Sequence, residues 1–105
     1  MKKHSILITH TAMEDLKRIA SYVAIELREP SIAKKLVGNI KEVIMSLEQM
    51  PTRYSLLRDA NLAVQEIRKI MVDNYIVCYT VSEKDNVVTI VRILYNRRDW
   101  VKILE

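Results

Sequence analysis

Apolar residues recur at helical spacing in two segments of the first half of the chain. The first segment opens with Thr11 and Glu14, whose spacing is that of a capping box, in which each side chain bonds a free backbone N–H. The apolar positions then recur every three or four residues, which predicts an amphipathic helix over 11–28 with Asp15 on its polar face. These apolar positions are Ala12, Leu16, Ile19, Ala20, Val23 and Leu27.

The second helical pattern begins at Pro30, a residue that the first turn of a helix tolerates because its missing N–H has no partner there. A wide apolar stripe follows, and Pro51 ends it near residue 49. Because only a short break separates the two helices, we expect an antiparallel hairpin whose two stripes cover one surface. The second stripe consists of Ala33, Leu36, Val37, Ile40, Val43, Ile44 and Leu47.

The periodicity changes in the second half, where three runs are rich in Val, Ile, Tyr and Thr. These runs predict strands over 66–72, 75–81 and 87–95. Short polar turns separate them, so the strands are expected to form an antiparallel meander. The run 75–81 is apolar on both faces, which favours an interior position in the sheet.

Three further segments complete the predicted fold. Residues 5–9 predict a short strand in the same sheet, and 51–65 predict an irregular connection with one helical turn. Residues 97–104 predict a final helical turn. The whole chain, 1–105, is therefore expected to be one α+β domain with an N-terminal strand, a helix hairpin, a three-stranded meander and a C-terminal turn.

Composition narrows the setting and the partners. The chain has 105 residues, half of them hydrophobic and 29% charged, which is the balance of one folded domain. Cys78 is the only cysteine, which excludes an internal disulfide and suits the cytoplasm. No apolar run approaches the roughly 20 residues of a membrane span, so no membrane partner is expected. The net charge of +4 is too mild to identify a nucleic-acid partner by itself.

Residue types also exclude several kinds of site. Gly38 is the only glycine, so the chain has no glycine-rich phosphate loop. No group of Cys, His and carboxylate residues has the spacing of a metal site, and neither a metal nor a cofactor is expected. His4 and His10 are distant in sequence from the other candidates, and we expect neither to be catalytic.

Arg92 is the most informative charged residue, because it interrupts the apolar run of the last predicted strand. A charge in the middle of a strand costs stability unless it is paired or hydrated. Two interpretations remain open at this point. Arg92 either pairs with an Asp or Glu across the sheet and stabilises the fold, or lines a face that binds an anion.

Other cations lie on or after the predicted strands. Alternation places Arg68 on one face of the sheet and Lys69 on the other. Arg97 and Arg98 follow the last strand. Arginine bonds an anion at two points, so this half of the chain is the expected place of anion recognition. We assign Lys69, Arg97 and Arg98 to nucleic-acid or target binding. Tyr95 ends the last strand, where it either stacks on a base or packs as an ordinary aromatic residue.

The ordered set of segments resembles the RelE/ParE toxins of bacterial toxin–antitoxin modules. The similarity covers roughly residues 5–104. In the first predicted helix the matching residues are 12–16, Ile19 and Tyr22, and in the second they are Pro30, Ala33, Ile40 and Leu47, before Pro51. In the central hairpin they are 67–69, 73–75 and Tyr79. The ending matches at 92–95 and 97–99.

This resemblance implies a function and partners. RelE-like members cleave mRNA in the ribosomal A site, whereas ParE-like members inhibit DNA gyrase. In both groups a cognate antitoxin neutralises the toxin, and their complex commonly represses its own operon. We therefore expect an antitoxin partner, contact with operator DNA only through the complex, and either ribosome and mRNA or gyrase as the target.

The resemblance also suggests a nuclease site. Arg68, Arg92 and Tyr95 match its positions, which makes them the candidate catalytic residues. Two guanidiniums would hold the scissile phosphate while a 2′-hydroxyl attacks it. The match has gaps, however. Leu94 occupies the position of a histidine in YoeB-type members, and 51–65 lacks the lysines of RelE. An mRNA nuclease, a gyrase inhibitor and a degenerate, nontoxic binding module therefore all remain open.

Overall fold

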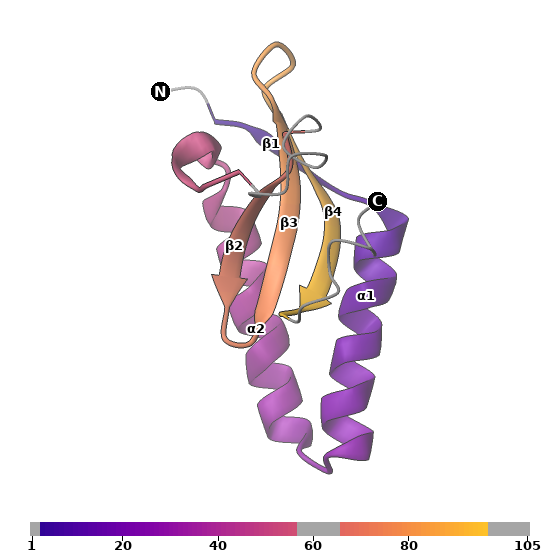
Figure 1. Ribbon diagram of the computed structural model, residues 1–105. Helices are drawn as coiled ribbons and strands as arrows, with labels where there is room; N and C mark the ends of the chain where they lie inside the picture. The colour runs from indigo at the N-terminus through magenta and orange to yellow at the C-terminus, as the bar shows by residue number, and fades with distance from the viewer. Residues whose placement is uncertain (1–2, 57–65, 97–105) are drawn as a thin grey trace.

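The computed structural model describes residues 3–56 and 66–96 of the chain as a helix hairpin packed on a four-stranded sheet (Figure 1). The elements follow the predicted order, and the α+β fold class is confirmed. They are β1 (Ser5–Ile8), α1 (His10–Ser21), the π-helical turn η1 (Tyr22–Glu26), α2 (Pro30–Ser46), the 3₁₀ turn η2 (Pro51–Arg53), β2 (Arg68–Val72), β3 (Tyr75–Ser82) and β4 (Val87–Tyr95).

The sheet is mixed, with strand order β1-β4-β3-β2. The three later strands form the predicted antiparallel meander, and β3 occupies an interior position as expected. The N-terminal strand joins the same sheet by pairing in parallel with β4, from Ser5 opposite Val87 to Ile8 opposite Ile90. Because β1 ends there, the remaining part of β4 pairs on that side with no other strand of the described residues.

A β-bulge changes the register in the middle of β4. Tyr79 of β3 pairs with Ile90, but the adjacent Cys78 pairs with Arg92, so Val91 is left without a partner. One extra residue in a strand reverses the face toward which every later side chain points. The bulge therefore places Arg92 on the same face of the sheet as Cys78.

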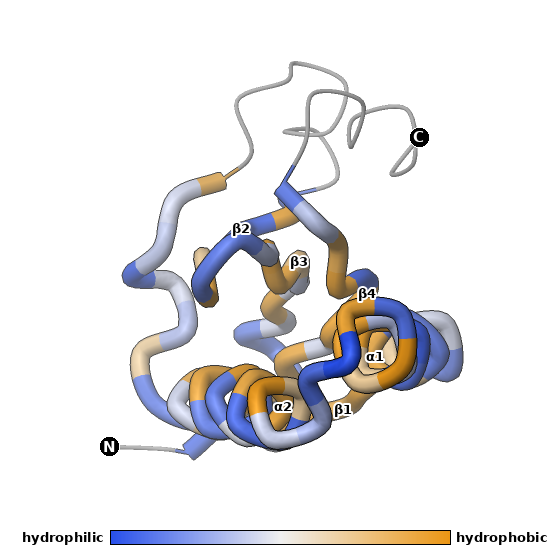
Figure 2. Tube along the Cα trace, turned by 90° about the horizontal axis from the view of Figure 1, so that it is seen from below, coloured by the Kyte–Doolittle hydropathy of each residue, from blue (hydrophilic) through white to orange (hydrophobic). Residues whose placement is uncertain are grey.

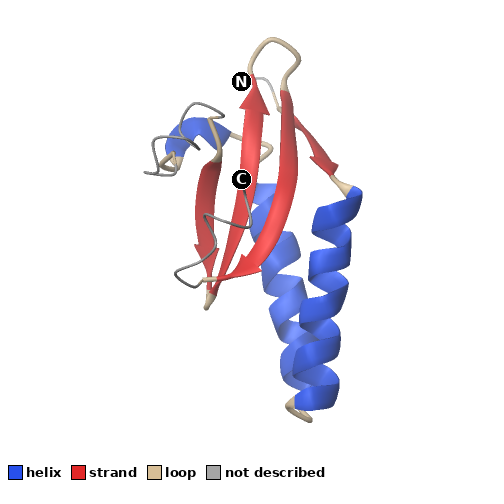
Figure 3. Cartoon of the chain, turned by 45° about the vertical axis from the view of Figure 1, so that its right-hand side comes forward, coloured by secondary structure: helices blue, strands red, loops and turns tan. Residues whose placement is uncertain are grey.

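Both helices cover one face of the sheet, as the view along the hairpin shows (Figure 2). Their apolar stripes meet the inward side chains of the strands in one core. The hairpin also extends past the end of the sheet (Figure 3). The buried core cluster contains Ala12, Leu16, Val23, Ala33, Leu36, Ile40, Ile44 and Leu47 from the helical half, with Ile70, Val72, Val77, Tyr79, Val88, Ile90 and Ile93 from the sheet.

The start of α1 differs from the predicted capping box. Thr9, rather than Thr11, is the N-cap residue, and its Oγ1 accepts a hydrogen bond from the Ala12 N–H at 3.1 Å. The same hydroxyl donates to the Ile90 carbonyl at 2.9 Å. Thr9 thus caps the helix and also attaches it to β4. The bond to β4 is a tertiary contact, which the local sequence pattern does not reveal.

The end of the first helix also departs from the prediction. After Ser21 the chain forms a π-helical turn, in which the Leu27 N–H bonds to the Tyr22 carbonyl five residues earlier at 3.1 Å. The wider turn moves the following side chains around the helix axis relative to α-helical spacing. Leu27, predicted to face the core, is consequently exposed.

The second helix begins at Pro30 as predicted but ends at Ser46, three residues earlier than expected. The connection after it contains the predicted helical turn at Pro51–Arg53. Residues 57–65 of this connection and the expected C-terminal turn over 97–104 lie outside the described residues. Neither helix in the described ranges has the length and apolar character needed to cross a membrane.

Gly38 lies on the exposed side of α2, where an added Cβ would meet no atom within 4 Å. We expect Gly38→Ala to raise the free energy of unfolding by about 0.5–1 kcal/mol, because alanine restricts the unfolded chain more than glycine does. Urea denaturation measures this gain as a higher midpoint at an unchanged slope. A lower midpoint would contradict the expectation.

Candidate functional site

An ion pair between Asp15 and Arg92 joins α1 to the second half of β4. The Asp15 side chain is only 3% exposed. Its Oδ2 accepts from Arg92 Nε at 2.8 Å, and its Oδ1 accepts from Arg92 Nη2 at 2.9 Å. This bidentate geometry is the strongest arrangement of a guanidinium and a carboxylate. Arg92 therefore has the partner that one of its two sequence interpretations required, although that partner lies on a helix and not across the sheet.

Asp15 also completes the backbone hydrogen bonds of β4. Its Oδ2 accepts from the Ile93 N–H at 3.0 Å. Ile93 lies beyond Ile90, where pairing with β1 ends, so within residues 3–56 and 66–96 its N–H meets no strand on that side. A buried N–H without an acceptor costs free energy. The carboxylate takes the place of the missing strand, and Asp15, predicted to lie on the polar face of the helix, is instead part of the interior.

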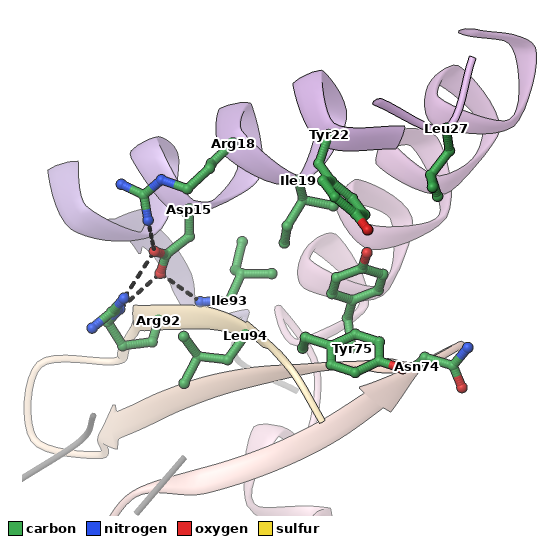
Figure 4. A pocket seen from close by; sticks show the side chains of 11 residues that line it. Asp15, Arg18, Ile19, Tyr22, Leu27, Asn74, Tyr75, Arg92, Ile93 and Leu94 are labelled. Carbon is green, nitrogen blue, oxygen red and sulfur yellow. Dashed lines mark hydrogen bonds and ion pairs between the residues drawn. The ribbon is translucent and has the colours of Figure 1, made fainter. Parts of the chain in front are cut away.

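Arg18 brings a second guanidinium to this carboxylate. Its Nη1 lies 3.7 Å from Asp15 Oδ1, while its side chain is 74% exposed. Figure 4 shows Asp15 between Arg18 and Arg92. The cluster contains two guanidiniums and one carboxylate, so it carries an excess positive charge. Both carboxylate oxygens already bond to Arg92, which leaves Arg18 only weakly paired. The hydrogen bonds of Asp15 raise the pKa of Arg92 further, so this charge persists at neutral pH.

A groove of about 790 Å³ runs from this charged cluster to the end of the helix hairpin (Figure 4). One wall comes from α1 and the π-helical turn, and the other from the start of β3 and the end of β4. We call it the tyrosine groove, because three tyrosines contribute to its lining. Its lining residues are Asp15, Arg18, Ile19, Tyr22, Leu27, Asn74, Tyr75, Arg92, Ile93, Leu94 and Tyr95.

The tyrosines occupy the end of the groove away from Asp15. Tyr75 and Tyr95 face each other across the ends of β3 and β4 in an edge-to-face pair, with ring centroids 5.5 Å apart. Burial, followed by the proximity of Tyr95 and Tyr22, raises the pKa of Tyr75. Tyr75 is therefore neutral at physiological pH. The three rings offer apolar faces with hydroxyl groups at their edges. Tyr95 is about half-exposed, which leaves it accessible to a partner.

Arg68 lies apart from this groove. Its Nη1 donates to the Tyr54 carbonyl at 2.6 Å and to the Thr52 carbonyl at 3.2 Å, which fastens β2 to the preceding connection. Arg68 pairs with Tyr79 in the sheet, whereas Arg92 pairs with Cys78. Because adjacent residues of a strand point to opposite faces, the two arginines lie on opposite faces of the sheet. The structure does not bring them together.

The remaining predicted cations fall into two groups. Lys69 pairs with Cys78 in the register and so shares the sheet face of Arg92. Arg97 and Arg98 lie outside the described residues. Cys78 itself is fully buried, and burial raises the pKa of its thiol to about 12, which makes it unreactive at neutral pH. Within residues 3–56 and 66–96, no three His, Cys, Asp or Glu side chains gather as metal ligands would.

Comparison with known proteins identifies the family. A sequence profile described as "ParE toxin of type II toxin-antitoxin system, parDE" matches residues 6–100, nearly the whole chain. The chain belongs to this toxin family. The RelE/ParE resemblance seen in the sequence is confirmed, and the protein is a toxin of a type II toxin–antitoxin system. No curated protein sequence gives a significant match.

Solved structures support the same fold for this ParE-family toxin. A chain of the chromosomal ParDE system from P. aeruginosa is 23% identical, with a TM-score of 0.73 over 90% of this chain and 98% of that chain. A chain of the toxin–antitoxin complex RelBE2 from Mycobacterium tuberculosis is 19% identical, with a TM-score of 0.66 over 91% and 94% of the two chains. The isolated E. coli RelE toxin is 17% identical, with a TM-score of 0.55 over 97% and 99%.

The sequence patterns did not single out several residues of this toxin's groove as site residues, Asp15 and Tyr22 among them. Asp15 lies three residues after Ala12 and four before Ile19, and this spacing places it on the buried stripe. An acidic residue on that stripe signals a buried cation partner. Tyr22 is one of the residues that carry the family resemblance, but no sequence pattern assigned it a role in a site, and in the structure its ring is about half exposed.

Proposed function

We propose that this ParE-family toxin arrests growth by binding DNA gyrase and inhibiting it, without cleaving RNA. The observation that carries the proposal is the separation of Arg68 and Arg92 on opposite faces of the sheet. Each guanidinium is also engaged, Arg68 by two backbone carbonyls and Arg92 by the Asp15 carboxylate. The cations that a nuclease would aim at one phosphate are thus used to hold the fold.

The chemistry of RNA cleavage explains why this arrangement favours a binding toxin. Attack by a 2′-hydroxyl requires a base for its proton, an acid for the leaving oxygen and cations around the phosphate. Leu94 lines the groove at the position where a histidine would serve as acid or base. Both Asp15 oxygens are occupied by hydrogen bonds to Arg92. The raised pKa of Tyr75 keeps its hydroxyl protonated at neutral pH, so it does not serve as a base.

Ribosome-dependent cleavage of mRNA is the second candidate, because one observation favours it. Arg92 and Tyr95, two of the three residues assigned to catalysis, line the same groove. In this alternative Tyr95 would stack on a base or transfer a proton near the phosphate. Arg68 would then take no part, since it belongs to the other face of the sheet.

We also infer that a cognate antitoxin binds and neutralises this toxin. Family membership supports this inference, and the similar solved structures include toxin–antitoxin systems from P. aeruginosa and M. tuberculosis. The antitoxin is expected to be a small protein encoded beside the toxin, with acidic groups that complement the arginines. Operator DNA would be contacted only through the complex.

Two parallel assays, one with the purified toxin and one in induced cells, test the proposal. The purified toxin is expected to inhibit DNA supercoiling by gyrase in proportion to its concentration, and the co-purified product of the adjacent reading frame should abolish this inhibition. In parallel, primer extension on mRNA from induced cells is expected to show no new cuts within codons. Undisturbed supercoiling together with new cuts would overturn the proposal in favour of the nuclease.

A further inference from the structure

We infer that the tyrosine groove is the surface through which the toxin binds its protein target. This inference rests on the proposed inhibition of gyrase and names the chemistry of the contact. The occupant is a segment of the target that presents apolar side chains to the tyrosine end and a carboxylate to Arg18. The apolar end, the charged end and the rigidity of the walls each support it.

The charged end of the groove has one more positive than negative side chain. Two guanidiniums, from Arg18 and Arg92, face the single carboxylate of Asp15. Arg92 makes the two short hydrogen bonds, and Arg18 remains at 3.7 Å with most of its surface in solvent. A fork of exposed N–H donors beside an apolar wall is suited to a partner's carboxylate, since desolvation on docking strengthens such a pair.

The apolar end gathers three exposed large side chains along one groove. Tyr22, Leu27 and Tyr95 are each more than half exposed although they border one groove. The other exposed large apolar residues of the described ranges are distributed over β1, β2, the helices and the connections. Tyrosine and arginine are, with tryptophan, enriched among the residues that dominate binding energy, and here they occur together.

The walls of the groove are held in place before any partner arrives. Asp15 ties α1 to Arg92 and to the Ile93 N–H, and the Tyr75–Tyr95 pair joins the ends of β3 and β4. The Asn96 N–H bonds to the Asn74 carbonyl at 2.8 Å and closes the sheet at this end. A preformed surface loses little conformational entropy on binding, which favours affinity.

The test compares a groove variant with a matched control in the supercoiling assay. The variant Arg18→Gln with Tyr22→Ala removes the exposed guanidinium and one exposed ring, and neither side chain is needed by the core. We expect at least a tenfold increase in the toxin concentration that halves gyrase activity. The control is Lys17→Gln, which removes an exposed charge next to Arg18 on α1 but outside the groove. Its half-inhibitory toxin concentration should stay within twofold of the wild-type value.

Circular dichroism and urea denaturation verify that both variants are folded. If wild type inhibits gyrase and the groove variant inhibits it equally well, the inference is wrong while the proposed function stands. If the variant loses only antitoxin binding, or changes only self-association in gel filtration, the groove belongs to the antitoxin or to a second copy, and the inference is again wrong. If wild type itself leaves supercoiling undisturbed, both proposals fail.

Discussion

Replacing Asp15 with alanine is expected to lower the free energy of unfolding by about 3–5 kcal/mol, as for other buried ion pairs that lose one partner. The substitution leaves Arg92, only 24% exposed, without its carboxylate. It also removes the acceptor of the Ile93 N–H at a position of β4 that lies beyond its pairing with β1. Urea denaturation followed by circular dichroism measures the loss. For a domain of this size the loss is a large share of the total stability.

The neighbouring residue Glu14 provides the control. Its side chain is 44% exposed and makes only loose ion pairs, at 3.8 Å with Lys17 and 3.9 Å with His10. Glu14→Ala should change stability by less than about 0.5 kcal/mol. If Asp15→Ala cost no more than this control, the ion pair would be irrelevant to stability.

The same pair complicates any experiment on Arg92. Arg92→Ala would leave a carboxylate buried without its partner, and we expect it to destabilise the protein about as much as Asp15→Ala. A loss of toxicity in that variant would follow from unfolding whether or not Arg92 contacts a target. Variants of Arg18 avoid this ambiguity, since Arg18 is exposed and only weakly paired.

The elements of the fold could be predicted because each depends on local patterning. Helical periodicity placed α2 from Pro30 onward, and the β-rich runs placed β3 and β4 within one residue of their observed bounds. The interior position of β3 followed from its two apolar faces. These signals lie within single segments, so no knowledge of tertiary contacts was needed to read them.

The site could not be predicted in the same way, because its contacts join distant segments. Asp15 and Arg92 are 77 residues apart, and either could have paired with another charge. Simple alternation along β4 would place Arg92 on the face of Ile90, which is also the face of Arg68. The bulge at Val91 reverses that assignment, and nothing in a run of valines and isoleucines indicates where a bulge occurs.

Replacing Tyr79 with alanine is the second large effect that we expect, a loss of about 3–5 kcal/mol. Tyr79 is the largest of the fully buried side chains among the described residues, and it belongs to the core between β3 and the helices. Its removal would leave a cavity that the surrounding aliphatic residues fill only partly. The midpoint of urea denaturation, compared at equal slope, measures the loss.

Tyr79→Phe separates the ring from the hydroxyl and serves as the matched variant. The Tyr79 hydroxyl donates to the Pro51 carbonyl at 2.7 Å and so links β3 to the connection after α2. Burial raises its pKa to about 12, which keeps the donor protonated at neutral pH. Phenylalanine preserves the packing but leaves the Pro51 carbonyl without this donor, so we expect a loss of about 1–2 kcal/mol. Equal losses for alanine and phenylalanine would show that the hydrogen bond, and not the packing of the ring, accounts for the stability that Tyr79 provides.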